Sequence, residues 1–278
     1  MTYRHWSVGT RSRMESQKDR RVKRCVWHSL GRVRYDTGLE IQDRVAAERI
    51  AETRPDTLLL VEHPPTITLG RRAVAEDVLW SPGDLVRHGI SVARVGRGGQ
   101  ATYHGPGQLV GYPITRLSSG GRGVRNFVAG IEAVLIGAAG EFGVRAVQRS
   151  GHPGVWAGER KLASIGIEVR RGVSRHGFAL NVDMDLSPFQ AIVPCGTPGL
   201  VLTDLSRAAG GTITMEGASA AVLRAWRRVF GMIEEAEMSI EVSAPADERF
   251  RQQGNFRTED IVEGAQPSPQ QRPAADKG

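Results

Sequence analysis

Apolar residues in the middle of the chain recur with two different spacings. Over residues 39–53 they fall on one helical stripe, and Asp36 or Thr37 is placed to cap that helix. The apolar run at residues 57–62 is short and ends in a His-Pro-Pro sequence, which is typical of a buried strand. The pattern therefore predicts a helix followed closely by a strand.

The same two spacings alternate through the second half of the chain. A longer helix is predicted over residues 125–142, with Asn126 near its start and Gly143 after its end, and its inward side chains are Phe127, Ile131, Val134, Leu135 and Ala138. Three strand-like runs and a final amphipathic helix follow, at residues 154–157, 164–170, 177–182 and 215–233. Strands interleaved with a few long helices predict an α/β or α+β domain with one main sheet.

The most unusual stretch is residues 97–113, which hold five glycines and two prolines among polar side chains. Glycine lets the backbone turn sharply or approach a ligand closely, and proline fixes the turn between glycines. Apolar runs at residues 90–95 and 109–114 flank this stretch, so we expect a strand, a ligand-facing loop and a second strand. Plain hairpin turns would also use the glycines, but the polar side chains favour the ligand-facing loop. The stretch lacks the Gly-Lys-Ser/Thr sequence of a Walker loop.

Positive charge is concentrated at the start of the chain. Of 278 residues, 40% are hydrophobic, which is enough for a sizeable core. Residues 1–24 carry eight Lys or Arg and two acidic residues, which leaves 29 basic and 28 acidic residues for the remainder. The net charge of +7 therefore gives no reason to expect a nucleic acid or a membrane as a partner.

Composition divides the chain into three regions. We expect a basic disordered extension at residues 1–24, a folded catalytic domain at 25–243 and a disordered tail at 244–278 that has few large apolar residues. The extension lacks the continuous apolar segment of a secretory signal, so we expect a cytoplasmic protein. Translation from Met14 is an alternative explanation of the extension.

The chain has two cysteines, and their surroundings differ. Cys25 follows the basic extension, and an inert thiol at the start of a strand is the expected interpretation. Cys195 lies among prolines and glycines in residues 193–199, which fix a turn with open backbone N–H groups. The sequence by itself leaves a structural and a nucleophilic role equally open. A free thiol is mostly protonated at neutral pH, so a nucleophilic cysteine needs a cation nearby. The histidines lack HExxH spacing, and we expect no metal and no cofactor.

Five ordered blocks carry a family resemblance. Residues 97–113 (RGGQATYHGPGQLVGYP) are accompanied by residues 58–66 (LLLVEHPPT), 161–166 (KLASIG), 176–181 (HGFALN) and 192–196 (IVPCG). Together they resemble the signature of the lipoyl(octanoyl) transferases, and the resemblance spans roughly residues 30–235. It implies the fold of the biotin and lipoate ligase catalytic domains, which is a mixed central sheet backed by helices with a smaller sheet beside it.

The resemblance implies an activity and its partners. The family transfers an octanoyl group from octanoyl-acyl carrier protein to a lysine of lipoyl domains, in 2-oxoacid dehydrogenase complexes or the glycine cleavage H protein, as the first step of endogenous protein lipoylation. It implies an acyl-thioester on Cys195 and assigns the nearby cation to Lys161. The sequence by itself favours a surface lysine at a strand entry for Lys161. No nucleic acid or membrane partner is implied, and we expect a monomer.

The family's substrate-binding residues also carry over to this chain. They are Arg97, Gly98, Gly99, Gln100, Ala101, Thr102, Tyr103, His104, Ser164, Ile165, Gly166, Gly177, Phe178 and Ala179. His104 is a rival base, because cysteine and histidine often pair in nucleophilic catalysis. The sequence shows no third residue to orient it, however, and the resemblance implies that it lines the acyl site, so we expect it to bind or stabilise the substrate.

Two other classes of protein remain to be weighed. A lipoate or biotin ligase would activate a free acid with ATP and would need no nucleophilic cysteine. A non-catalytic carrier-binding protein would need the loop but not Cys195. Arginines that steer acidic partners are a further possibility, with ordinary solvated arginines as the alternative; the candidates are Arg71, Arg72, Arg149 and Arg160.

Overall fold

The computed structural model describes residues 25–118, 121–231 and 233–235. Within these residues, eight strands form one mixed sheet. In spatial order they are β11 (Ile233–Glu235), β1 (Cys25–Arg32), β2 (Asp56–Glu62), β6 (Gln108–Ile114), β10 (Val173–Asn181), β9 (Arg160–Arg170), β8 (His152–Ala157) and β7 (Ala146–Arg149). The strands β11, β1 and β2 pair in parallel and the others are antiparallel. The predicted extension at residues 1–24 and tail at 244–278 lie outside the described residues.

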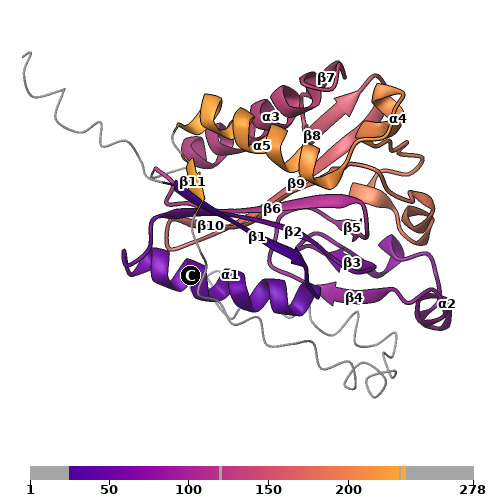
Figure 1. Ribbon diagram of the computed structural model, residues 1–278. Helices are drawn as coiled ribbons and strands as arrows, with labels where there is room; N and C mark the ends of the chain where they lie inside the picture. The colour runs from indigo at the N-terminus through magenta and orange to yellow at the C-terminus, as the bar shows by residue number, and fades with distance from the viewer. Residues whose placement is uncertain (1–24, 119–120, 232, 236–278) are drawn as a thin grey trace, which may run out of the picture.

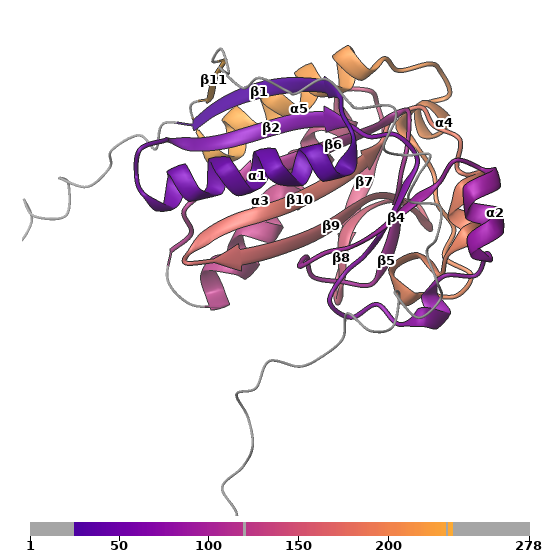
Figure 2. The same cartoon turned by 90° about the horizontal axis from the view of Figure 1, so that it is seen from below.

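A smaller sheet of three strands lies beside the main one (Figures 1 and 2). It contains β4 (Ser91–Arg94), β3 (Thr66–Leu69) and β5 (Ala101–His104), in that order. Its core includes Ile67, Leu69 and Tyr103, and the short helix α2 (Pro82–Arg87) contributes Leu85. The expected mixed sheet with a smaller sheet beside it is confirmed.

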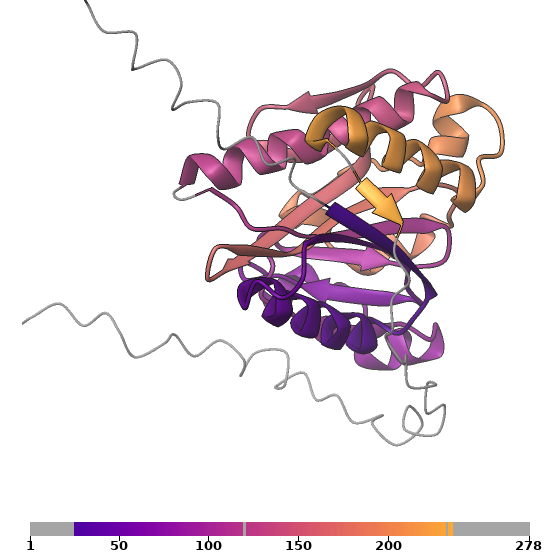
Figure 3. The same cartoon turned by 60° about the vertical axis from the view of Figure 1, so that its left-hand side comes forward.

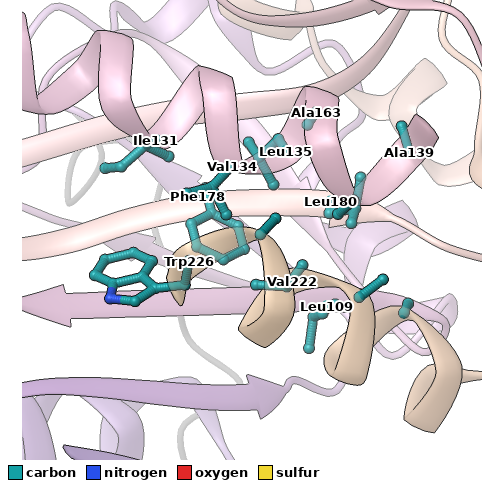
Figure 4. Packing of buried hydrophobic residues seen from close by; sticks show 14 of the residues in the cluster. Leu109, Ile131, Val134, Leu135, Ala139, Ala163, Phe178, Leu180, Val222 and Trp226 are labelled. Atoms are coloured by element: carbon teal, nitrogen blue, oxygen red, sulfur yellow. The ribbon is translucent and has the colours of Figure 1, made fainter. Parts of the chain in front are cut away.

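Two helices cover one face of the main sheet and a third covers the other (Figures 1 and 3). On one face α3 (Gly121–Gly140) and α5 (Met215–Phe230) lie side by side, and α1 (Tyr35–Ile50) crosses the opposite face. Figure 4 shows how Ile131 and Leu135 of α3 meet Phe178 of β10 and Trp226 of α5. Burial of a large apolar side chain contributes roughly 1.5–3 kcal/mol, so this layer supplies much of the stability.

The predicted elements agree with the structure in kind and differ at their ends. The five inward residues predicted for the long helix are all buried, and β2 begins one residue before the predicted strand. The first helix begins at Tyr35 rather than at residue 39, and no side chain caps it, so Asp36 and Thr37 are not its N-cap. The structure adds β5 inside the stretch that we expected to be a loop.

Among the described residues, α3 has one segment, Gly123–Gly140, that is long and apolar enough to cross a membrane by length and composition. Its inner residues Ile131, Val134 and Leu135 are fully buried against the sheet and α5. The apolar character of α3 is therefore used in the core of the domain.

Candidate active site

A cavity of about 410 Å³ lies where the small sheet meets β9 and β10. Strand β5 and the turn before it form one wall, because the glycines at positions 98 and 99 let that turn lie directly on β9. The Gly98 N–H donates to the Ile167 carbonyl at 3.0 Å, which fixes this contact. The predicted site residues that line the cavity are Arg97, Gly98, Gly99, Gln100, Ala101, Thr102, His104, Lys161, Ser164, Ile165, Gly166, Gly177, Phe178, Ala179 and Cys195.

Tyr103 is the exception among the predicted binding residues. Side chains alternate along a strand, so Thr102 and His104 on β5 face the cavity while Tyr103 faces the other way. Its ring packs edge-on against Phe189, with the ring centroids 5.4 Å apart, in the core of the small sheet. The structure therefore places Tyr103 behind the cavity wall.

Cys195 and Lys161 meet in the wall of the cavity. Lys161 Nζ lies 3.3 Å from Cys195 Sγ and donates a hydrogen bond to it, and the Ser164 hydroxyl lies 4.0 Å from the same sulfur. Lys161 is buried at the start of β9, whereas Cys195 is half-buried in the segment between β10 and α4 (Leu205–Ala209). Residues far apart in the sequence thus form a thiol and amine pair that faces a cavity.

The turn that presents Cys195 is held by its own backbone and by Gln100. Pro194 begins a single 3₁₀ turn, and both Cys195 (φ 55°) and Gly196 (φ 64°) adopt left-handed backbone angles. The left-handed conformation is costly for a non-glycine residue, so the turn must be fixed by its surroundings. The Gly196 N–H donates to the Val193 carbonyl at 3.0 Å, and a side chain at position 196 would overlap the Gln100 amide. Gln100 therefore lies directly against the turn.

Trp156 fixes the other side of Lys161. The Lys161 ammonium lies 5.4 Å from the centroid of the buried Trp156 ring, and the Arg149 guanidinium lies 4.4 Å from the same centroid. Aromatic rings attract cations at this range. Gly154 makes room for this arrangement, since a β-carbon there would meet the Lys161 side chain at 2.8 Å. The lysine is thus directed toward the sulfur.

Hydrogen bonds fix His104 in one neutral form. The Gln108 amide nitrogen donates to the Tyr103 carbonyl (3.2 Å) and to Asn181 Oδ1 (2.9 Å), so its oxygen faces His104 Nδ1 at 2.7 Å. Nδ1 therefore carries the proton, and Nε2 lies 3.3 Å from the Thr68 hydroxyl. Burial, followed by the neighbouring His63, lowers the pKa of His104 to about 3. A neutral histidine with both nitrogens occupied is poorly suited to act as the base.

Arg97 brings a second positive charge to the cavity. The buried guanidinium donates to the Thr68 carbonyl at 2.6 Å, to the Thr68 hydroxyl at 2.8 Å and to the Gly98 carbonyl at 3.0 Å. Burial lowers its pKa, and it forms no ion pair with any carboxylate of the described residues. Its charge therefore remains available to the cavity.

Sequence reasoning missed several lining residues. His176 lies on β10 with φ 55°, and burial, followed by Arg175, lowers its pKa to about 3. Tyr35 at the start of α1 and Tyr112 on β6 also line the cavity. Tyr112 lies within the glycine-rich stretch, which was a usable signal, whereas Tyr35 had none. Among the described residues, no group of three or more His, Cys, Asp or Glu side chains is arranged to hold a metal.

The described domain thus combines a mixed sheet and a smaller sheet with a cysteine and a lysine in contact beside a cavity, and known proteins share this fold. The family described as "Lipoyl protein ligase A/B catalytic domain" matches residues 34–227. The chain belongs to this family and, within it, to the octanoyltransferases. It is an acyltransferase that transfers octanoyl groups.

Two octanoyltransferases align with this chain over most of their own length. The octanoyltransferase of Alkaliphilus metalliredigens is 42% identical over 203 residues, which cover 73% of this chain and 93% of the relative. The octanoyltransferase of Solibacter usitatus is 49% identical over 175 residues, which cover 63% of this chain and 80% of the relative.

Solved structures agree on the fold. A bipartite lipoate protein ligase from Thermoplasma acidophilum superposes with a TM-score of 0.60 at 16% identity, covering 87% of this chain and 90% of that one. A lipoate-protein ligase A solved with ATP gives a TM-score of 0.61 at 16% identity, covering 87% of this chain and 92% of that one. The expected lipoate ligase fold is confirmed.

Proposed function

We propose that this protein transfers octanoyl from octanoyl-acyl carrier protein to the acceptor lysine of a lipoyl domain through a thioester on Cys195. The observation that carries the proposal is the 3.3 Å contact between Lys161 Nζ and Cys195 Sγ in the wall of the cavity. A cysteine suits this exchange because one thioester replaces another, so the reaction needs no ATP.

In the first half-reaction, the Cys195 thiolate attacks the carbonyl carbon of the donor thioester. The new C–S bond forms as the bond to the carrier's sulfur breaks, and the carrier leaves as a thiol after taking up a proton. The Lys161 ammonium stabilises the thiolate before attack, because it donates a hydrogen bond to Sγ. Lys161 is also placed to supply the proton to the leaving sulfur, which leaves it neutral.

In the second half-reaction, the amine of the acceptor lysine attacks the octanoyl carbonyl on Cys195. The C–N bond forms, the C–S bond breaks, and the attacking nitrogen loses one proton. Neutral Lys161 accepts that proton, which restores the ammonium beside the released thiolate. One amine therefore serves both half-reactions.

The cavity walls suit an eight-carbon chain. Apolar side chains from three elements line it: Val110 of β6, Val128 of α3 and Phe178 of β10. Burial of each CH₂ group contributes about 0.8 kcal/mol, so the whole chain gains several kcal/mol before ordering costs. We assign substrate binding to the predicted residues that line this cavity.

The remaining expectations belong to the same proposal. Acceptors are the lipoyl domains of 2-oxoacid dehydrogenase complexes or the glycine cleavage H protein. The protein acts as a cytoplasmic monomer without a metal or other cofactor.

A transfer assay tests this function. Purified protein is mixed with octanoyl-acyl carrier protein and an apo lipoyl domain in the absence of ATP, and octanoylation of the domain is followed by mass spectrometry. We expect the wild type to transfer octanoyl, and we expect the rate of transfer by Cys195→Ala to be lower by about 1,000-fold or more. Octanoylation that requires ATP and free octanoate, and that persists in Cys195→Ala, would instead identify a ligase.

A further inference from the structure

Three arginines line a second hollow of about 450 Å³, which lies beside the start of β9, the strand that carries Lys161. Arg145 comes from the turn after α3, Arg160 from the start of β9 and Arg207 from α4. All three are exposed. Separate segments of the chain thus place three exposed arginines around one concave surface.

The charge of this arginine hollow is poorly neutralised by the protein itself. Arg207 pairs with Asp204, but neither Arg145 nor Arg160 forms an ion pair with a carboxylate of the described residues. Like charges placed close together repel one another, so an anion bound between Arg145 and Arg160 gains from both. The hollow is therefore suited to a partner that presents negative charge.

Other arginines near the cavity are engaged differently. Arg149 folds back onto Trp156 and binds Glu159 at 2.7 Å, so it is already neutralised. Arg71 and Arg72 line the active-site cavity from the turn that follows β3 of the small sheet. Of the four steering arginines considered from the sequence, Arg160 alone lines the hollow.

The arginine hollow and the reactive pair share one wall. Thr203 lines the hollow, and its N–H donates to the Lys161 carbonyl at 3.0 Å, while the Lys161 N–H donates to the Val201 carbonyl at 2.9 Å. Val201, two residues before Thr203 in the sequence, is 51% exposed. Its neighbour Leu200 lines the active-site cavity. A partner seated in the hollow therefore lies next to the segment that borders Cys195.

We propose that the arginine hollow docks acidic side chains of the acyl carrier protein that delivers the octanoyl group. This inference rests on the proposed function. The donor fits better than the acceptor, because the acceptor's reactive lysine is a cation that a cluster of arginines repels, whereas the donor thioester is uncharged. Docking here leaves the active-site cavity free for the acyl chain.

Charge reversal tests the docking surface. The double variant Arg145→Glu/Arg160→Glu is compared with the wild type, using octanoyl-acyl carrier protein and the small donor octanoyl-pantetheine. We expect the KM for octanoyl-acyl carrier protein to rise about tenfold or more with kcat unchanged, and the rise to shrink with added salt. Transfer from octanoyl-pantetheine should be unchanged. The matched control is Arg44→Glu, which reverses an exposed arginine on α1.

Three results of this experiment would contradict the docking surface, and a fourth would contradict the proposed function. An unchanged KM for octanoyl-acyl carrier protein in the double variant, or an equal loss with octanoyl-pantetheine, overturns the docking surface. A higher KM for the lipoyl domain alone assigns the hollow to the acceptor and also overturns it. If the wild type transfers from neither donor, the proposed function fails instead, irrespective of the arginines.

Discussion

Lys161 has to meet two demands that require opposite protonation states. It must be an ammonium to stabilise the Cys195 thiolate and a neutral amine to accept the proton of the attacking lysine. Its burial between Trp156 and the sulfur suits both roles, because the Nζ atom is held 3.3 Å from Sγ with little access to water. The two roles are separable by substitution.

We predict that Lys161→Arg separates the half-reactions. Arginine keeps the positive charge that stabilises the thiolate but neither gives up nor accepts a proton near neutral pH. A thiol is acidic enough for the carrier's sulfur to leave as a thiolate and take its proton from water, whereas the attacking amine has to lose its proton to a base. Acylation of Cys195 should therefore be retained within about tenfold while transfer to the acceptor falls about 100-fold or more. Lys161→Met should impair both steps. Single-turnover mass spectrometry measures the two rates separately. Equal losses of both rates in Lys161→Arg would contradict the dual role.

Apolar periodicity in the sequence predicted the long helices and strands, whereas it could not predict the short elements. The inward residues of α3 were predictable because an amphipathic helix repeats its apolar face over several turns. Strand β5 has four residues between glycine-rich turns, too few to show a period. His176 was missed as a cavity residue because it lies one residue before the predicted strand at 177–182.

The sequence predicted which residues belong to the candidate site, but it did not predict how they are arranged in space. Cys195 and Lys161 were recognisable from their segments and from the family resemblance, whereas their contact depends on how β9 and the Cys195 turn pack. The strand parity that turns Tyr103 away was hidden because β5 itself was not predicted.

Close contact between β10 and β6 depends on glycine at position 177. A β-carbon there would overlap the Gly111 carbonyl oxygen on β6. We predict that Gly177→Ala lowers the free energy of unfolding by about 1–3 kcal/mol, measured by urea denaturation. Gly211→Ala is the matched control, because nothing lies within 4 Å of the added carbon. Equal stability of both variants would show that the strands separate without cost.

The domain buries three histidines that the fold keeps neutral. Burial is the largest cause in each case, and it lowers the pKa of His63 to about 4 and the pKa values of His104 and His176 to about 3. The unfolded chain therefore binds more protons than the folded chain between pH 6.5 and those values. Stability contributed by the neutral form is present above that window and is lost as pH falls through it.

We predict that the free energy of unfolding falls as pH is lowered from 7 to 5. Each of the three histidines contributes a loss of up to about 2 kcal/mol over that interval. Urea denaturation at the two pH values measures the change, and His104→Asn should reduce its size. Stability that does not change between pH 7 and 5 would contradict the neutral, buried histidines.

The active unit is expected to be shorter than the chain. The family match ends at residue 227, and β11, whose Ile233 is buried beside β1, ends at Glu235. We predict that a chain cut to residues 25–243 keeps its kcat for octanoyl transfer within about twofold. Transfer kinetics of the cut and full-length chains check this, and loss of kcat in a folded shortened chain would show that an end segment takes part.

The covalent intermediate is the central claim, and intact-protein mass spectrometry after mixing with octanoyl-acyl carrier protein, without acceptor or ATP, tests it most directly. We predict one octanoyl adduct on the wild type that hydroxylamine removes. Cys25→Ala should keep the adduct, because burial raises the pKa of the Cys25 thiol to about 12 and leaves it unreactive. Cys195→Ala should have no adduct. An adduct that persists in Cys195→Ala, or a wild type that transfers octanoyl without becoming acylated, would contradict the mechanism.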